Sequence, residues 1–134
     1  GKARGQLIGG NLSLIIDSMG TINEPASKGR ILFLEEIEEK TYRIDRMLQQ
    51  LKRAGKLDDL AGLVIGQFTA ISDGSTAFGS TWRECLEQIV SDYNYPVAFG
   101  WPIGHEAANY PIVHGAEYTL EVNNSAAKLM TQLS

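Results

Sequence analysis

The sequence contains a single cysteine, Cys85, and only two histidines, His105 and His114, among 134 residues. One cysteine cannot form an internal disulfide, and it cannot supply a cysteine cluster to a metal site. The two histidines are too far apart for a H-E-x-x-H pattern, so the sequence predicts no metal centre. Cys85 stands beside Leu86 and near Ile89 in a helical pattern, which is typical of a buried core residue.

The sequence also lacks a basic stretch and a long apolar run. Its net charge is −4, and Lys52-Arg53 is its longest basic run, which argues against nucleic acid or an anionic membrane as the main partner. No apolar run reaches the roughly 18 residues of a membrane-spanning helix, and no signal-peptide pattern occurs. The first residues, Gly1 to Gly5, do not resemble a natural N-terminus. We therefore expect a start at a domain boundary, which leaves a lost signal or upstream domain open.

The remaining composition is that of an ordinary globular domain. Hydrophobic residues make up 43% of the chain and charged residues 21%, and the length suits one domain, residues 1–134, with a substantial core. Helical spacing of apolar residues predicts three helices. They run from an Asn11 cap to Gly20, from a Thr41 cap to Gly55, and from Ser80 or Thr81 through Val90.

Strand patterns alternate with these helices. Continuous apolar runs at 31–34 and 60–68 are typical of strands that are buried on both faces. A shorter strand is predicted at 96–99, and 5–8 is a short apolar segment. Residues 116–122 alternate in polarity, Asn123-Asn124 is a turn signal, and 126–130 can return as a hairpin partner. The sequence therefore predicts an α/β fold, in which a mixed, mostly parallel sheet is flanked by helices and ends in a C-terminal antiparallel hairpin.

Glu35 and Glu36 follow the apolar run at 31–34 directly. Active sites of α/β folds gather at the carboxyl ends of strands, and a carboxylate there can hold a histidine ring for general-base chemistry. Glu36 would point to the opposite face of the strand, so Glu35 is the candidate. Taken alone, Glu35 is more typical of a solvated loop acid.

His105 lies in the segment Phe99–Asn109, together with Gly100, Pro102 and Gly104. Taken alone it is typical of a plain loop histidine, but the glycines and proline indicate a loop of defined shape. His105 and Glu35 are two thirds of a nucleophilic triad. His114 is expected to lie at a turn and carries no predicted role.

A nucleophile is missing. The chain has no G-x-S-x-G elbow, and its serines fall in a loop of turn composition or in predicted helices, at Ser72, Ser75, Ser80, Ser13 and Ser18. Three hypotheses stay open: part of an enzyme whose serine lies elsewhere, a non-catalytic binding or assembly module, and a site in which Cys85 acts with His105. Gly9-Gly10-Asn11 is more typical of a tight turn than of an anion site.

Several collinear segments together resemble the C-terminal domain of the LD-carboxypeptidase family of serine peptidases. They span nearly the whole chain: Gly9–Leu12, Gly20–Thr21, Gly29–Ile37, Tyr42–Arg46, Gly66–Thr69, Pro102–Glu106 and Asn109. The resemblance implies a cytoplasmic enzyme of peptidoglycan recycling that removes the terminal D-amino acid from murein tetrapeptides through a Ser–His–Glu triad. It carries over Glu35 and His105 as catalytic residues and implies no cofactor.

The same resemblance implies partners. The family's serine comes from an N-terminal domain that has no counterpart here, so this chain would be the C-terminal half and inactive alone. A homodimer is also implied. The related microcin C immunity peptidases share the triad and hydrolyse a peptide-nucleotide antibiotic, which keeps a second substrate class open.

Overall fold

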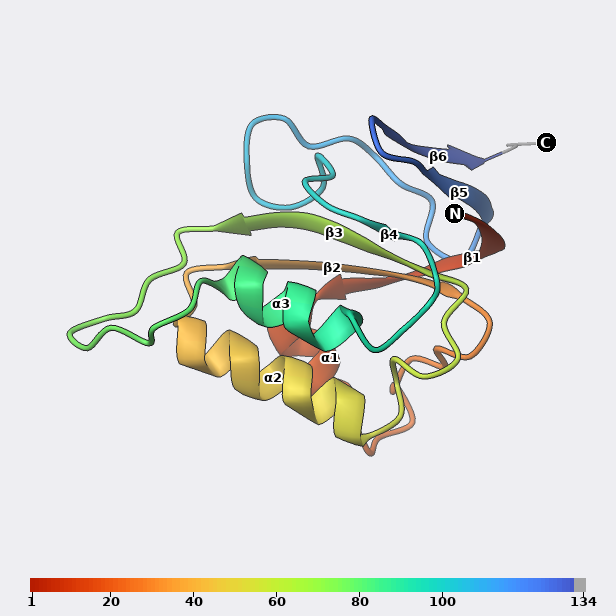
Figure 1. Ribbon diagram of the computed structural model, residues 1–134. Coiled ribbons are helices and arrows are strands. Elements are labelled where there is room, and N and C mark those ends of the chain that lie inside the picture. Colours follow the sequence, from red (N-terminus) through yellow and green to blue (C-terminus); the bar gives the residue numbers. More distant parts are fainter. Residues whose placement is uncertain (132–134) are drawn as a thin grey trace.

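The computed structural model describes residues 1–131 as one sheet with three helices (Figure 1). In chain order the elements are β1 (Lys2–Asn11), α1 (Leu12–Ser18), β2 (Ile31–Ile37), α2 (Thr41–Arg53), β3 (Gly62–Thr69), α3 (Trp82–Val90), β4 (Val97–Ala98), β5 (Glu117–Val122) and β6 (Ala127–Thr131). The strand order is β4-β3-β2-β1-β5-β6. The first four strands are parallel, while β5 and β6 pair antiparallel. The predicted fold class and C-terminal hairpin are confirmed.

All three helices cover the same face of the sheet (Figure 1). Each of the crossovers β1-α1-β2, β2-α2-β3 and β3-α3-β4 steps to the next strand in the same direction. Because such crossovers share one hand, their helices fall on one side. The segment 99–116 runs across the other face, which no helix among residues 1–131 covers.

The sheet separates two apolar clusters. On the helix face, Leu34 and Ile65 pack with residues of all three helices. On the loop face, Phe33 and Val64 pack with Ile103 and with residues of β5. Successive strand residues point to opposite faces, so the apolar runs at 31–34 and 62–65 contribute to both clusters. This explains why those runs show no alternation.

The helix starts follow the sequence signals at two of three places. Asn11 accepts a hydrogen bond from the Leu14 N–H, and Thr81 forms a capping box with Glu84. The predicted Thr41 cap is wrong by one residue, because Lys40 occupies the cap position and Thr41 begins α2. The Thr41 N–H bonds to the Ser72 carbonyl instead, so a neighbouring loop satisfies a free donor at this helix start.

Two expectations about strand ends are also wrong. Gly9 and Gly10 form no tight turn but continue β1 to Asn11. A Cβ on Gly9 would lie 2.0 Å from the Phe33 carbonyl oxygen, and its φ is +136°, so glycine is required by close approach to β2. The strand predicted at 31–34 runs on to Ile37, which places Glu35 and Glu36 inside β2. No helix in the described part of the chain has the length and apolar character needed to span a membrane.

Candidate active site

Glu35 and His105, which are 70 residues apart in sequence, meet at the carboxyl end of β2. The Nδ1 atom of His105 lies 2.8 Å from the Glu35 Oε2 atom. The Glu35 side chain is 8% exposed and that of His105 is 46% exposed. The structure therefore brings the two predicted site residues together, with the acid inside the fold and the ring at its surface.

The burial of Glu35 corrects the expectation of a solvated loop acid. Glu35 is a strand residue that pairs with Asn11 of β1, and it lies on the loop face of the sheet beyond Phe33. The segment 99–116 covers that face and excludes water from the carboxylate. Glu36 has the opposite orientation, as predicted, because adjacent strand residues alternate.

A bulge in β3 stands directly opposite Glu35. Leu34 pairs with Ile65 and Glu36 pairs with Phe68, so two residues of β3, Gly66 and Gln67, oppose Glu35 alone. An extra residue of this kind re-aims the side chains next to it. Ile65 and Phe68 both pack on the helix face, while Gly66 and Gln67 contact the loop on the other face.

Backbone hydrogen bonds dock the histidine loop along β3. The Trp101 N–H donates to the Ile65 carbonyl at 2.9 Å, and the Gln67 N–H donates to the Ile103 carbonyl at 2.8 Å. Gly66 permits this approach, because a Cβ there would lie 2.4 Å from the Ile103 oxygen and 3.3 Å from the Glu35 Cβ. The loop shape anticipated from its glycines and proline thus has a physical basis in this docking.

The geometry determines which ring nitrogen of His105 can act as a base. A carboxylate accepts hydrogen bonds, so in the neutral ring the proton sits on Nδ1 and points to Glu35. Nε2 then carries the lone pair and makes no hydrogen bond to residues 1–131. A ring held in this way can take a proton from a nearby hydroxyl, and the carboxylate stabilises the resulting imidazolium.

Glu36 has a very different environment on the helix face. It is 3% exposed and accepts four hydrogen bonds: from Asn11 Nδ2 at 2.7 Å, the Ser13 N–H at 2.9 Å, the Ser13 hydroxyl at 2.6 Å and the Ile37 N–H at 3.0 Å. The bonds from Ser13 place the carboxylate at the first turn of α1, where negative charge is favoured. The sequence did not predict this cluster, although Asn11 and the two adjacent glutamates after the apolar run at 31–34 were visible signals.

The other candidates lie apart from His105. Cys85 is 5% exposed and packs in the helix-face cluster, so the sheet separates it from His105, and burial raises the pKa of its thiol. His114 lies at a turn, as predicted, and its Nε2 atom accepts from the Gly9 N–H at 3.3 Å. Within residues 1–131, no serine or cysteine bonds to His105. That range also holds no group of three or more metal-ligating side chains.

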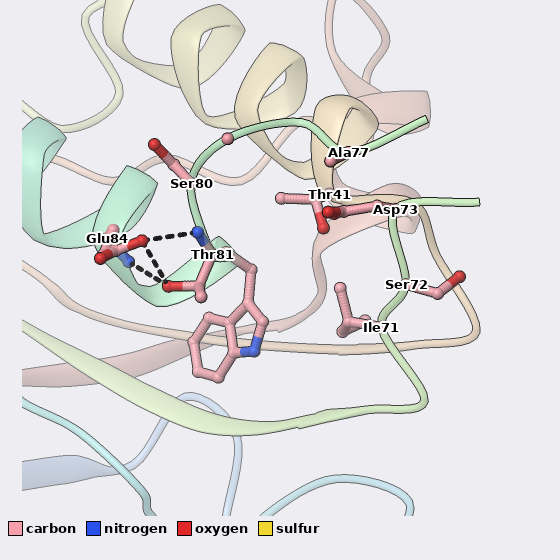
Figure 2. A pocket seen from close by; sticks show the side chains of 10 residues that line it. Thr41, Ile71, Ser72, Asp73, Ala77, Ser80, Thr81 and Glu84 are labelled. Carbon is pink, nitrogen blue, oxygen red and sulfur yellow. Dashed lines mark hydrogen bonds between the residues drawn. The ribbon is translucent and has the colours of Figure 1, made fainter. Parts of the chain in front are cut away.

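A separate hollow of about 520 Å³ lies between the starts of α2 and α3 and includes neither Glu35 nor His105 (Figure 2). Its two carboxylates already have partners. Glu84 accepts from the Thr81 N–H at 2.7 Å, and Asp73 accepts from the Phe78 N–H at 3.2 Å. Hydrogen bonding, first from Thr41 and then from Phe78, lowers the pKa of Asp73. These groups cap helices and shape a loop.

Comparison with known proteins agrees with the geometry. The LD-carboxypeptidase C-terminal domain matches residues 4–120. A probable murein peptide carboxypeptidase of Bacillus subtilis is 35% identical over 134 residues, which are 100% of this chain and 42% of that protein. The microcin C7 self-immunity protein of Escherichia coli is 24% identical over 135 residues, covering 98% of this chain and 38% of that protein.

Solved structures give the same result. The crystal structure of muramoyltetrapeptide carboxypeptidase from Oxalobacter formigenes superposes with a TM-score of 0.86 at 32% identity, covering 96% of this chain and 45% of that chain. This chain therefore spans less than half the length of the relatives it matches. On the match over residues 4–120, it belongs to the LD-carboxypeptidase family, as a C-terminal domain of that family.

Proposed function

We propose that this chain is the C-terminal half of a two-domain, serine-type LD-carboxypeptidase and supplies the Glu and His of its Ser–His–Glu triad. The observation that carries the proposal is the 2.8 Å contact between Glu35 Oε2 and His105 Nδ1. A buried carboxylate and a half-exposed imidazole form the acid–base half of such a triad. The serine lies in an N-terminal domain outside this chain.

In this mechanism each residue has one role. His105 Nε2 takes the proton of the serine hydroxyl as that oxygen attacks the scissile carbonyl, and it then passes the proton to the leaving amine. Glu35 holds the ring by its Nδ1–H and stabilises the imidazolium. The exposed edge of His105 faces the N-terminal domain, which brings the serine to it.

The proposed substrate is a murein tetrapeptide, from which the enzyme releases the terminal D-amino acid during peptidoglycan recycling in the cytoplasm. The names of relatives above 30% identity support this, since they refer to murein peptide and muramoyltetrapeptide carboxypeptidases. The proposed partners are the N-terminal domain of the same protein and a second copy in a homodimer. The microcin immunity relative is less similar, at 24% identity, so hydrolysis of a peptide-nucleotide antibiotic is the second candidate.

A third hypothesis, a non-catalytic module, predicts that Glu35 and His105 do not meet, and their contact argues against it. The Cys85 hypothesis requires a thiol within reach of the ring, and the intervening sheet argues against that.

The test uses the complete protein that contains this chain. Release of the terminal D-amino acid from an L,D-tetrapeptide is followed by mass spectrometry for the wild type and for His105→Asn, with His114→Asn as the matched control. We expect turnover by the wild type and the His114 variant only, and none by the 134-residue chain alone. Turnover by that chain, or full activity of His105→Asn, would refute the proposal. Cleavage of a peptide-nucleotide with no tetrapeptide turnover would favour the second candidate.

A further inference from the structure

We propose that Gln67 is the positioning residue of this site: it holds the loop on both sides of His105 and so fixes the imidazole against Glu35. The inference rests on the proposed function and adds a residue that contacts neither Glu35 nor His105 by a hydrogen bond. Its basis is the bulge in β3, which turns the Gln67 side chain toward the loop.

Three hydrogen bonds connect Gln67 to the loop. Its N–H donates to the Ile103 carbonyl at 2.8 Å, which fixes the segment two residues before His105. Its side-chain Oε1 accepts from the Glu106 N–H at 3.1 Å, and its Nε2 donates to the Ala108 carbonyl at 2.7 Å. One residue therefore binds the loop before the histidine, immediately after it and three residues after it.

The packing beneath the loop adds to these bonds. A Cβ on Gly104 would lie 2.8 Å from the Gln67 Oε1 and 2.9 Å from the Gln67 Cβ. The backbone next to His105 thus rests directly on the Gln67 side chain. Thr69 contributes a further bond from its hydroxyl to Glu106 Oε1 at 3.0 Å, on the same side of β3.

His105 needs such support because its own contacts are few. Its side chain is 46% exposed, and its one hydrogen bond within residues 1–131 is to Glu35. A single bond leaves the ring free to swing with its loop, and Nε2 must be held within hydrogen-bond reach of a serine on another domain. A displacement of about 1 Å at such a site costs roughly 100-fold in rate. The hydrogen bonds of Gln67 to the loop limit that displacement of the His105 ring.

The experiment replaces Gln67 in the complete protein by methionine, which keeps the length of the side chain and removes both amide hydrogen bonds. The matched control is Gln88→Met on the exposed surface of α3, on the other face of the sheet. We expect Gln67→Met to lower kcat about 100-fold and to leave KM within about twofold, because a misplaced base slows the reaction without removing substrate contacts. Gln88→Met leaves both parameters unchanged.

A second readout reports on the ring itself. A histidine Nδ1–H that donates to a carboxylate gives a far-downfield proton resonance, which is assigned here by its loss in His105→Gln. We expect this resonance to weaken or disappear in Gln67→Met and to persist in Gln88→Met. If Gln67→Met does not fold, Gln67→Asn, which is polar and one methylene shorter, is measured in its place and is expected to show the same changes to a smaller extent.

The outcomes separate the two proposals. Wild-type kcat and an unchanged resonance in the Gln67 variant would overturn the positioning role, and loss of activity in His105→Asn would then still support the proposed function. If His105→Asn retains full activity, the proposed function fails, and the resonance alone decides whether Gln67 positions the ring. A KM that rises while kcat stays unchanged would also overturn the positioning role.

Discussion

Glu35 and Glu36 are adjacent, both are buried, and they lie in opposite environments on the two faces of β2. Glu36, on the helix face, accepts four hydrogen bonds from fixed groups of β1, α1 and its own strand. Glu35, on the loop face, binds one partner, the half-exposed ring of His105. A carboxylate whose acceptor sites are filled by hydrogen bonds from the fold stabilises that fold. A carboxylate that binds only one exposed imidazole ring is available for chemistry.

The two clusters around these residues differ in the same way. The helix face is built from three amphipathic helices, whose apolar residues fill the space against the sheet. The loop face is covered by a segment that is held by hydrogen bonds to the edge of β3 and by close approach at Gly66. Substitutions on the helix face should therefore change stability, and substitutions on the loop face should change activity.

The largest expected effect is on the loop face. Glu35→Gln in the complete protein should lower kcat/KM by about 10³- to 10⁴-fold, because the amide no longer stabilises the imidazolium and can hold the wrong tautomer. The free energy of unfolding should change by less than about 1.5 kcal/mol, the value of one typical hydrogen bond. Tetrapeptide turnover and urea unfolding measure the two quantities.

The exposed Glu38, three residues further along, provides the control as Glu38→Gln, which should leave both quantities unchanged. Wild-type turnover by Glu35→Gln would show that activity does not depend on Glu35, and the functional difference between Glu35 and Glu36 would then be refuted.

Glu36→Gln should have the opposite profile. The new amide NH₂ group must face at least one of the donors that now bond to Glu36, so one bond is lost and two donors oppose each other. We expect a loss of about 2–4 kcal/mol in the free energy of unfolding, measured by urea unfolding. Turnover by the folded fraction should stay within a few-fold of wild type. If Glu36→Gln loses more turnover than Glu35→Gln, Glu36 and not Glu35 would be the residue on which activity depends.

The sequence predicted the strands, the helices and the pair of site residues because each has a local signal. Apolar runs, an Asn11 cap, a helix start at Ser80 or Thr81 and a Gly/Pro-rich loop all act within a few residues. The opposite orientation of Glu35 and Glu36 follows from strand geometry alone. The burial of Glu35 did not follow, because it depends on a loop that is 70 residues away in sequence.

The bulge at Gly66-Gln67 also lay beyond prediction. Only a glycine inside an apolar strand pattern hinted at it, and the register shift appears only when β2 and β3 are paired. The close approach of Gly9 to Phe33 has no local sequence signal either, and the prediction of a turn at Gly9-Gly10 is wrong for that reason. Contacts between distant strands determine both features, so no short window of sequence contains them.

Gly66→Ala should reduce both activity and stability. Its Cβ would lie 2.4 Å from the Ile103 carbonyl oxygen, so the histidine loop must move away from β3. We expect kcat to fall about 100-fold and the unfolding free energy to fall by about 1–3 kcal/mol.

The matched control for Gly66→Ala is Gly5→Ala, near the N-terminal end of β1 and away from Glu35. A Cβ on Gly5 would lie 2.7 Å from the Gly29 carbonyl oxygen. It should cost similar stability and leave kcat unchanged. Equal losses of activity in the two variants would show that general strain, and not the position of the loop, limits turnover.

Cys85 gives the smallest expected effect and tests the helix face from within. Burial raises the pKa of its thiol, so little reactive thiolate is present in the folded protein at pH 8, and alkylation should be slow until guanidinium chloride unfolds the chain. Because the folded thiol holds its proton to higher pH than the unfolded one, its contribution to stability is present below about pH 8.5 and is lost as pH rises toward the folded value. Cys85→Ala should flatten that alkaline decline, cost about 1 kcal/mol and leave turnover within twofold. Rapid alkylation of the native protein with loss of activity would place chemistry on the helix face and contradict the division of roles between Glu35 and Glu36.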